Sequence, residues 1–206
     1  MTRKRIKVGA ISILLLICIV TVQKISYASL TSKDKVTNTL NLGDINIEVS
    51  EKFTPPKDWD GDEYRKAVKI KNNSTSPALI RVSIIPRWVD EKGNSWPGDT
   101  NLVRLNYETK NIIANQNTIK NNKWIYGNDN YYYYSSIVAK EKETKQILKS
   151  VSANIPEELQ ERYENKTLIV DVKAEAVQAT KDAYKKTWSN IENQGIHKML
   201  ENLCTR

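Results

Sequence analysis

The amino-acid sequence predicts a mainly β protein, an antiparallel β-sandwich with a C-terminal amphipathic helix. Residues 167–179 (TLIVDVKAEAVQA) alternate apolar and charged side chains, which is the period of a strand with one buried face. Such a strand needs partners to complete its core, and similar stretches recur upstream without intervening helices. About seven to nine strands of this kind indicate an antiparallel sandwich rather than a βαβ fold, and we expect it to occupy residues 45–179.

Residues 1–28 have the features of an export signal. Four basic residues precede an uncharged apolar run from Val8 to Val22, and Ser26 and Ala28 are small residues at the positions that a signal peptidase recognises. We therefore expect cleavage between Ala28 and Ser29 and a secreted protein. The alternative is a retained membrane anchor, although the run is shorter than the roughly 20 residues that a spanning helix needs.

Removal of this signal changes both the charge and the cysteine content. It holds five of the 32 basic residues and none of the 24 acidic ones, so the formal charge falls from +8 to +3. The high isoelectric point belongs mainly to the signal and does not indicate a nucleic-acid partner. Only Cys204 remains, so no disulfide can form within the mature chain. Cys204 is either an idle thiol or a site of intermolecular pairing.

The segment of residues 29–44 is polar with scattered apolar side chains. Its apolar residues include Val36, Leu40 and Leu42, and the pattern fits either a floppy terminus or a strand that needs a partner. The first clear strand follows at residues 45–49, where isoleucine and valine alternate with polar residues.

Two further strands, residues 64–71 and 78–85, flank the polar turn of residues 72–77. This arrangement predicts an antiparallel hairpin, with Arg81 on the outward face of its second strand. The region of residues 110–123 is rich in Asn, Lys and Gln, and we expect an exposed insertion that Ile112, Ile113 and Ile119 anchor.

The last third of the chain combines strands with helical segments. The run from Tyr131 to Tyr134 favours a strand, since aromatic rings fit both faces of a pleated sheet. Another strand opens at residues 147–151, and residues 156–165 fit one helical turn or more. In residues 180–206 apolar side chains recur every three and four residues, which predicts an amphipathic helix. Gly195 weakens its middle, so two short helices are the alternative.

Groups that could carry catalysis are sparse. His197 is the single histidine, so no HExxH zinc helix can be built, and it is interpreted as a solvated helix residue. A nucleophile pair of Cys204 and His197 would lie at a helix end that frays, and it is disfavoured. We predict no catalytic residue, no metal ligand and no cofactor, and interpret the chain as not being an enzyme.

Two other clusters allow either a ligand site or an ordinary structural role. The acidic loop of residues 58–63 (DWDGDE) has the alternating carboxylates of a calcium loop but lacks the later glutamate, so a solvated loop is preferred. The tyrosine run with Trp88 and Trp124 offers a platform for stacking sugars or bases. The preferred interpretation is that these rings pack into the sandwich and cover its rim.

Four motifs stand in an order that is typical of one group of exported proteins. They are NLGDINIEVSE, VKIKNNSTSPALIRVSI, DNYYYYSSIVAKEKETKQIL and AEAVQA, the last followed by Trp188. Over residues 40–188 the chain resembles the TasA and camelysin-like proteins of Gram-positive bacteria. These carry an alternate signal peptide that a dedicated SipW-type signal peptidase processes. Residues 140–143 depart from the pattern, where a proline–glycine turn is expected, and the tail beyond Trp188 has no place in it.

The resemblance implies a jelly-roll β-sandwich and a secreted subunit of extracellular matrix fibres in biofilms. It also implies self-association, in which residues 29–44 of one subunit add as a strand to the next, with Val36, Leu40 and Leu42 as candidate donor residues. A companion fibre-anchoring protein is a further implied partner. The residue pattern agrees, because a polar–apolar segment can complete an exposed sheet edge. Head-to-tail contacts that do not close generate filaments.

Two alternatives to the fibre subunit stay open. Camelysin-like proteins have also been classed as metallopeptidases, and the single His197 argues against carrying that activity over. The other alternative is a binding module on the cell surface that uses its aromatic rim for ligands and does not polymerise.

Overall fold

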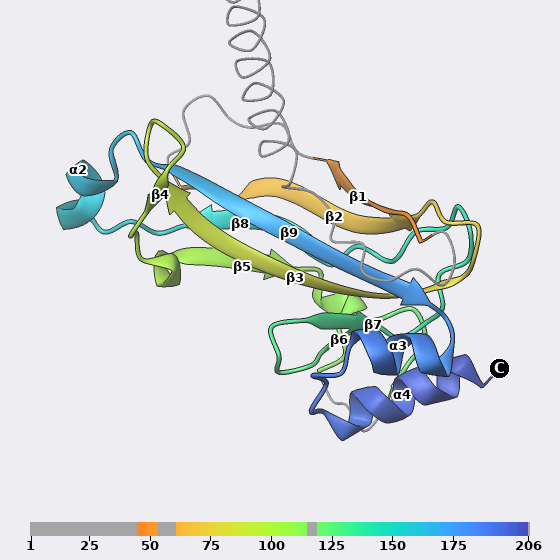
Figure 1. Ribbon diagram of the computed structural model, residues 1–206. Helices are drawn as coiled ribbons and strands as arrows, with labels where there is room; N and C mark the ends of the chain where they lie inside the picture. Colours follow the sequence, from red (N-terminus) through yellow and green to blue (C-terminus); the bar gives the residue numbers. More distant parts are fainter. Residues whose placement is uncertain (1–44, 53–60, 115–118, 206) are drawn as a thin grey trace, which may run out of the picture. The chain divides into compact units, whose positions relative to one another are not determined.

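A computed structural model shows two antiparallel β-sheets that face each other, with two helices at the C-terminal end (Figure 1). It describes residues 45–52, 61–114 and 119–205. The cleavage site at Ala28 and Ser29 and the candidate donor residues Val36, Leu40 and Leu42 lie outside these described residues. The predicted mainly β, antiparallel fold with a C-terminal helical region is confirmed. The predicted hairpin of residues 64–71 and 78–85 is wrong, because these two strands belong to different sheets and the turn between them connects the sheets.

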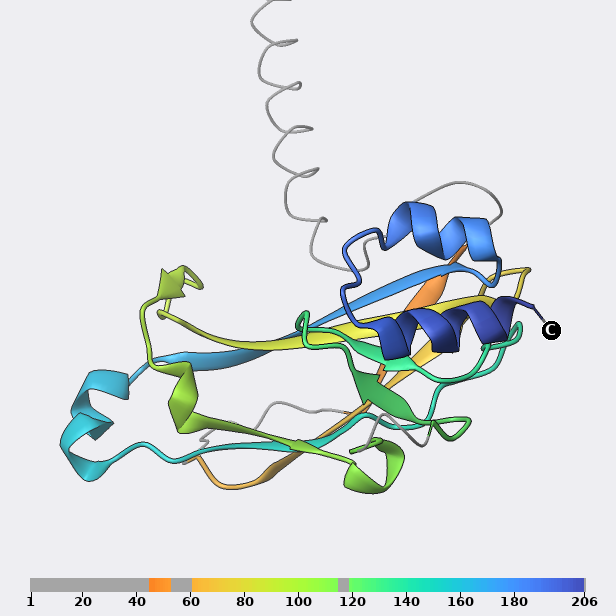
Figure 2. The ribbon, with the colours of Figure 1, turned by 90° about the horizontal axis from the view of Figure 1, so that it is seen from below.

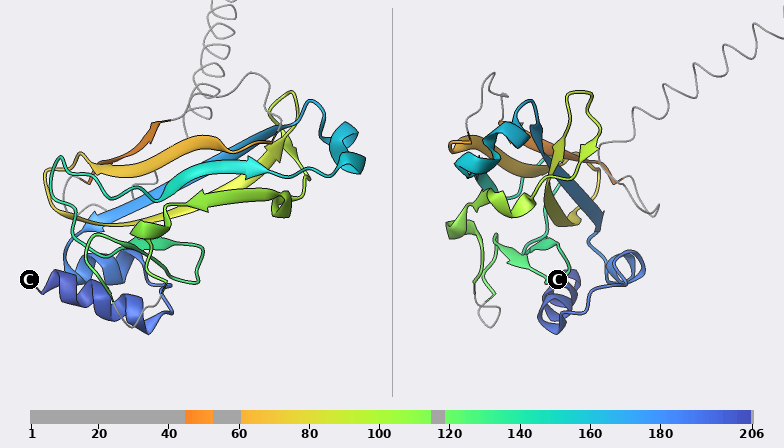
Figure 3. Two further views of the ribbon diagram at one scale, coloured as in Figure 1. Left: turned by 180° about the vertical axis from the view of Figure 1, so that it is seen from behind. Right: turned by 90° about the vertical axis from the view of Figure 1, so that its left-hand side faces the viewer.

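The first sheet has the strand order β1–β2–β8–β5, and all of its neighbours are antiparallel. The strands are β1 (Ile47–Lys52), β2 (Tyr64–Asn72), β8 (Leu148–Ala153) and β5 (Val103–Tyr107). The register shifts once in the β2–β8 pair, and once in the β5–β8 pair between Asn106 and Tyr107. In the view from behind, β2, β8 and β5 lie in front of the second sheet (Figure 3).

The second sheet is built on one long pair of strands. Its members are β3 (Ala78–Val89), β4 (Ser95–Trp96), β6 (Trp124–Tyr126), β7 (Tyr132–Tyr134) and β9 (Thr167–Gln178). All 12 residues of β9 pair with β3, from Thr167 opposite Val89 to Gln178 opposite Ala78. On its other side β3 pairs with β7 and, near its end, with β4. β6 pairs with β7.

Alternating apolar residues from the facing strands form the core between the sheets. Val68 and Ile70 of β2 and Ile80 and Val82 of β3 are almost completely buried in it. Trp124 lies in the same core, and its indole N–H donates to the Lys145 carbonyl over 2.8 Å. This core is the one that the period-2 patterns predict.

The connections form short helical turns. They are η1 (Thr100–Leu102), η2 (Thr109–Asn111), η3 (Glu157–Leu159) and α2 (Gln160–Tyr163). Tyr163 of α2 packs edge-on against Trp88 and Trp96, with ring centroids 4.9 Å apart in both pairs, and so closes one end of the sandwich. Ile112 and Ile113 anchor the region of residues 110–123 as expected, since they pack against the two cores. The expected anchoring by Ile119 is wrong, because this side chain is 39% exposed.

The C-terminal tail forms two helices, α3 (Lys181–Thr187) and α4 (Gln194–Cys204). The hydroxyl of Thr180 accepts the Ala183 N–H at the start of α3, and the Asn193 side chain accepts two N–H groups at the start of α4. The break between the helices lies before Gln194, so Gly195 belongs to the first turn of α4. Among the described residues no helix is long and apolar enough to cross a membrane.

These helices cover the outer face of the second sheet and create a second core (Figure 2). Leu79 of β3, Tyr133 of β7 and Val177 of β9 are buried there against residues of the helices. The residues of the tail in this core are Tyr184 of α3, Trp188 and Ile191 of the connection, and Ile196, Met199, Leu200 and Leu203 of α4. The tail is therefore part of the folded body. It also buries both faces of the C-terminal half of β9, which had been expected to have one buried face.

Truncation in this second core should destabilise the fold strongly. Ile196 is 1% exposed, so Ile196→Ala removes buried methyl groups and leaves a cavity. We expect the free energy of unfolding, measured with denaturant, to fall by about 3 kcal/mol. The exposed Lys198→Ala on the same helix should change it by less than about 0.5 kcal/mol. Equal stabilities of both variants would show that the helices do not contribute to the cooperative core.

Candidate functional site

The residues considered for catalysis are not assembled into a catalytic arrangement. The Nε2 atom of His197 lies 2.8 Å from the Ile191 carbonyl oxygen, beside the ring of Tyr184. Burial, together with the charge of Glu201, raises the pKa of the Cys204 thiol, which disfavours the thiolate that a nucleophile needs. Within the described ranges no three His, Cys, Asp or Glu side chains are grouped to hold a metal ion.

The acidic loop is only partly described, since Asp58 and Asp60 lie outside the described residues. Glu63 accepts a hydrogen bond from the Ser150 hydroxyl, and its carboxylate lies 3.8 Å from the Lys149 ammonium group. Protein groups thus already contact the carboxylate of Glu63.

The tyrosine run divides its rings between the two cores, as alternation along a strand requires. Tyr132 and Tyr134 face the core between the sheets, and Tyr133 faces the helices. Tyr132 also lies between Tyr107 and Tyr126, at 5.0 Å from each ring centroid. Tyr126 remains 37% exposed. The rings of the tyrosine run therefore serve mainly as internal packing, which is the interpretation preferred from the sequence.

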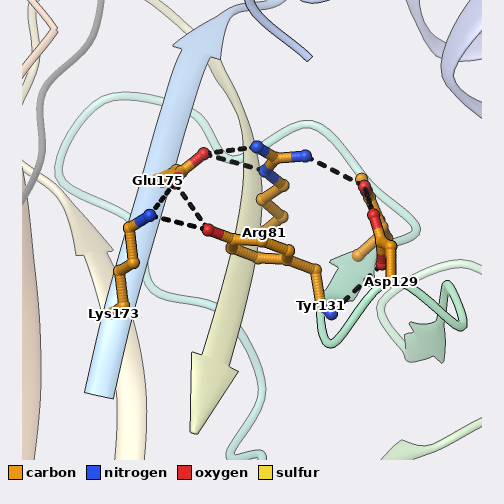
Figure 4. A network of polar contacts seen from close by, with 6 residues as sticks. Arg81, Asp129, Tyr131, Lys173 and Glu175 are labelled. Carbon is orange, nitrogen blue, oxygen red and sulfur yellow. Dashed lines mark hydrogen bonds and ion pairs between the residues drawn. The ribbon is translucent and has the colours of Figure 1, made fainter. Parts of the chain in front are cut away.

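The strongest polar feature is a buried ion pair between β3 and β9 (Figure 4). The Arg81 Nε and Nη2 atoms lie 2.8 and 2.7 Å from Oε2 of Glu175, and the two side chains are only 6% and 7% exposed. Arg81 lies on the outward face of β3, as predicted, but α3 and β7 cover it. Its guanidinium carbon is 4.1 Å from the ring centroid of Tyr131 and 4.9 Å from that of Trp188.

Further hydrogen bonds extend this pair into a network. The Tyr131 hydroxyl donates to Oε1 of Glu175 over 2.7 Å. The Lys173 ammonium group lies 2.8 Å from the Tyr131 hydroxyl oxygen and 2.8 Å from Oε1 of Glu175. On the other side Arg81 donates to the Tyr133 hydroxyl over 3.1 Å, which in turn donates to Asp129 over 2.6 Å. We call these six residues, Arg81, Asp129, Tyr131, Tyr133, Lys173 and Glu175, the arginine cluster.

The cluster sets the protonation states of its members. Burial opposes ionisation of Glu175, but hydrogen bonds from Lys173, Tyr131 and Arg81 outweigh it and lower the pKa of that carboxyl. Burial and the hydrogen bond to Asp129 raise the pKa of Tyr133, so its hydroxyl remains a donor. Because Arg81 and Glu175 are buried and paired with each other, this cluster fastens β9 to β3 and β7. The sequence offered no signal for it, because Arg81 and Glu175 are 94 positions apart.

The feature that points to a partner is the other edge of β9. Ala78 exchanges both backbone hydrogen bonds with Val138, which lies on the side of β3 away from β9. Backbone groups alternate sides along a strand, so odd-numbered residues of β3 bond β9 and even-numbered ones point away. Even-numbered residues of β3 lie opposite even-numbered residues of β9, and these pairs do not bond each other. The N–H and C=O groups of the even-numbered residues of β9 therefore point to its outer edge. In the part of the chain that the structure describes, β9 pairs only with β3.

The other sheet edges carry features that discourage strand pairing. β4 has two residues and β6 three, and β5 is short with a register shift. β1 places the charged Glu51 opposite Val68 on its inner face, where it pairs with Lys66 at 2.7 Å. β9 has 12 residues, an unbroken register and no proline. Its inward side chains from Leu168 to Ala176 are all apolar, and Leu168, Val170 and Val172 are only partly buried. The outer edge of β9 therefore has the features that allow another strand to pair with it.

Acid should destabilise the protein through Glu175. Because its pKa is lowered on folding, its stabilising contribution is complete above the unfolded pKa, near 4.3, and is lost as the pH falls through the folded pKa. At pH 7, Glu175→Gln should lower the free energy of unfolding by about 3 kcal/mol, because Arg81 loses its charged partner. As the pH falls from about 5 to about 3, the difference in the free energy of unfolding between the wild type and Glu175→Gln should become smaller.

The matched control is Asp171→Asn, which removes an exposed ion pair at 2.5 Å from Arg87 on the same two strands. Asp171→Asn should lower the free energy of unfolding by less than about 1 kcal/mol at pH 7. Denaturant titrations across this pH range measure both effects. A constant difference between wild type and Glu175→Gln at all pH values would contradict the assignment of the acid sensitivity to Glu175.

Comparisons of the chain with protein-family models, with curated proteins and with solved structures found no match. The resemblance to the TasA and camelysin-like proteins therefore depends on the four sequence motifs alone.

Proposed function

We propose that the chain is a secreted structural subunit of extracellular matrix fibres, which assemble by strand addition at the outer edge of β9. The observation that carries this proposal is the length and openness of that edge. The even-numbered residues from Leu168 to Ala176 each direct an N–H and a C=O away from β3, and no described strand pairs with them. The open part is the N-terminal half of this edge, because Leu168, Val170 and Val172 are partly exposed whereas Ala174 and Ala176 are buried. A long strand edge with an apolar inner face normally associates with another chain.

The candidate donor is residues 29–42 of a neighbouring copy. They precede the first described residue, Ile45, and their length of 14 residues matches the 12 residues of β9. Val36, Leu40 and Leu42 are separated by even numbers, so an extended segment would direct all three to one face. That face would cover the partly buried Leu168, Val170 and Val172 of the acceptor.

Strand addition of this kind produces filaments. The donor segment and the acceptor edge are different parts of the chain, so the proposed contact is head-to-tail and does not close. The jelly-roll connectivity, the export signal and its SipW-type peptidase, and a companion anchoring protein belong to the same proposal through the resemblance.

Deletion of residues 29–42 tests the donor. The mature protein should form filaments visible by electron microscopy, and the deletion variant should stay monomeric because it has no strand to donate. A synthetic peptide of residues 29–42 should bind the deletion variant. Filaments that persist unchanged after the deletion would exclude this segment as the donor.

A single proline tests the acceptor. Val170→Pro removes an N–H that points to the outer edge of β9, and it leaves the hydrogen bonds to β3 intact. Losing this hydrogen bond should weaken the association free energy of each subunit–subunit contact by about 1.4 kcal/mol. The critical concentration for filament formation should therefore rise roughly tenfold.

Val170→Thr, which keeps the N–H and the shape, is the control and should assemble like the wild type. Sedimentation of filaments at a series of protein concentrations measures both variants. Thermal unfolding of the monomer checks that Val170→Pro remains folded. Assembly of Val170→Pro at the wild-type critical concentration would place the acceptor elsewhere.

A further inference from the structure

We infer that Pro86 closes a second free edge in the same sheet, so that each subunit accepts one strand only and assembly stays linear. This inference rests on the proposed function, and it adds the residue that determines where a strand can be accepted. It starts from the side of β3 that faces away from β9.

That side of β3 has a gap. β7 pairs with Arg81 and Val82, and β4 pairs with Trp88 and Val89. Between these two contacts, residues 84–86 have no strand beside them within the described ranges. A gap inside a sheet exposes backbone groups in the same way as an outer edge does.

The alternation of the backbone identifies which groups the gap exposes. Even-numbered residues of β3 direct their N–H and C=O groups to this side, as the two bonds between Ala78 and Val138 show. In the gap these residues are Ile84 and Pro86. Because proline has no N–H, Ile84 supplies the single N–H donor there.

The position of Pro86 fits this role in detail. At the odd-numbered positions 85 or 87, a proline would remove a hydrogen bond between β3 and β9 and break the 12-residue pairing. At position 86 it leaves that pairing intact, with Pro86 directly opposite Val170. The proline therefore removes a donor only from the open side.

The neighbouring side chain explains why this gap needs protection. Ile85 is 49% exposed, the highest exposure among the large apolar side chains of the described residues. An exposed apolar side chain beside unpaired backbone groups favours association with another strand. The two edges of the sheet are thus unequal, since β9 is open and the gap in β3 is blocked by Pro86.

The test uses Pro86→Val in the mature full-length protein, because valine favours strands and restores the missing N–H. We expect filaments that bundle or branch in electron micrographs, where the wild type gives single unbranched ones. Pro97→Val is the control, since Pro97 is exposed in the loop after β4, and its filaments should match the wild type. Circular dichroism and thermal unfolding check the fold, and Pro86→Thr provides a second variant with a restored N–H.

A second arm separates this inference from the proposed function. In the Val170→Pro background, where strand addition at the β9 edge is weakened, the protein should elute as a monomer in size-exclusion chromatography at concentrations below its raised critical concentration. Adding Pro86→Val should shift it to a dimer or larger. That shift supports the role of Pro86 even if the wild type forms no filaments. Wild-type filaments together with a monomeric double variant and unbranched Pro86→Val filaments would overturn the inference and leave the proposed function standing.

Discussion

The structure depends on the pairing of β3 with β9. These two strands are 12 residues long each and pair without a register shift, although about 80 residues separate them in the chain. Their inner faces form the core between the sheets, and their outer faces carry the second core beneath α3 and α4. A shift of one residue would turn every buried side chain of one strand to the opposite face, so both cores depend on the same register.

The arginine cluster helps to fix that register. A buried ion pair contributes little net stability by itself, because both charges lose their hydration. It does penalise misalignment strongly, since any other register would leave Arg81 or Glu175 buried without its partner. The aromatic rings of Tyr131, which precedes β7, and of Trp188, which follows α3, pack on Arg81 and extend this constraint to both segments. The cluster thus belongs to the architecture, and it holds β9 rigid at the edge of its sheet.

Rigidity at that edge matters for the proposed assembly. An incoming strand gains most when the acceptor backbone is already ordered, because no further conformational entropy is lost there. The remaining edges of the described body are short, bulged, charged on their inner face or interrupted by Pro86. This distribution allows strand addition at β9 and restricts it elsewhere, which is what an unbranched fibre requires.

The sequence by itself determined the local features. Alternation in residues 64–71, 78–85 and 167–179 predicted strands, and the change of period after residue 180 predicted the helices, because both periods reflect which side chains face a core. Only the tertiary structure decided that α3 and α4 cover the second sheet, that Arg81 meets Glu175, and that β9 lies at an edge. These outcomes depend on contacts between residues far apart in the chain, and a local pattern carries no information about which strand becomes the neighbour of another.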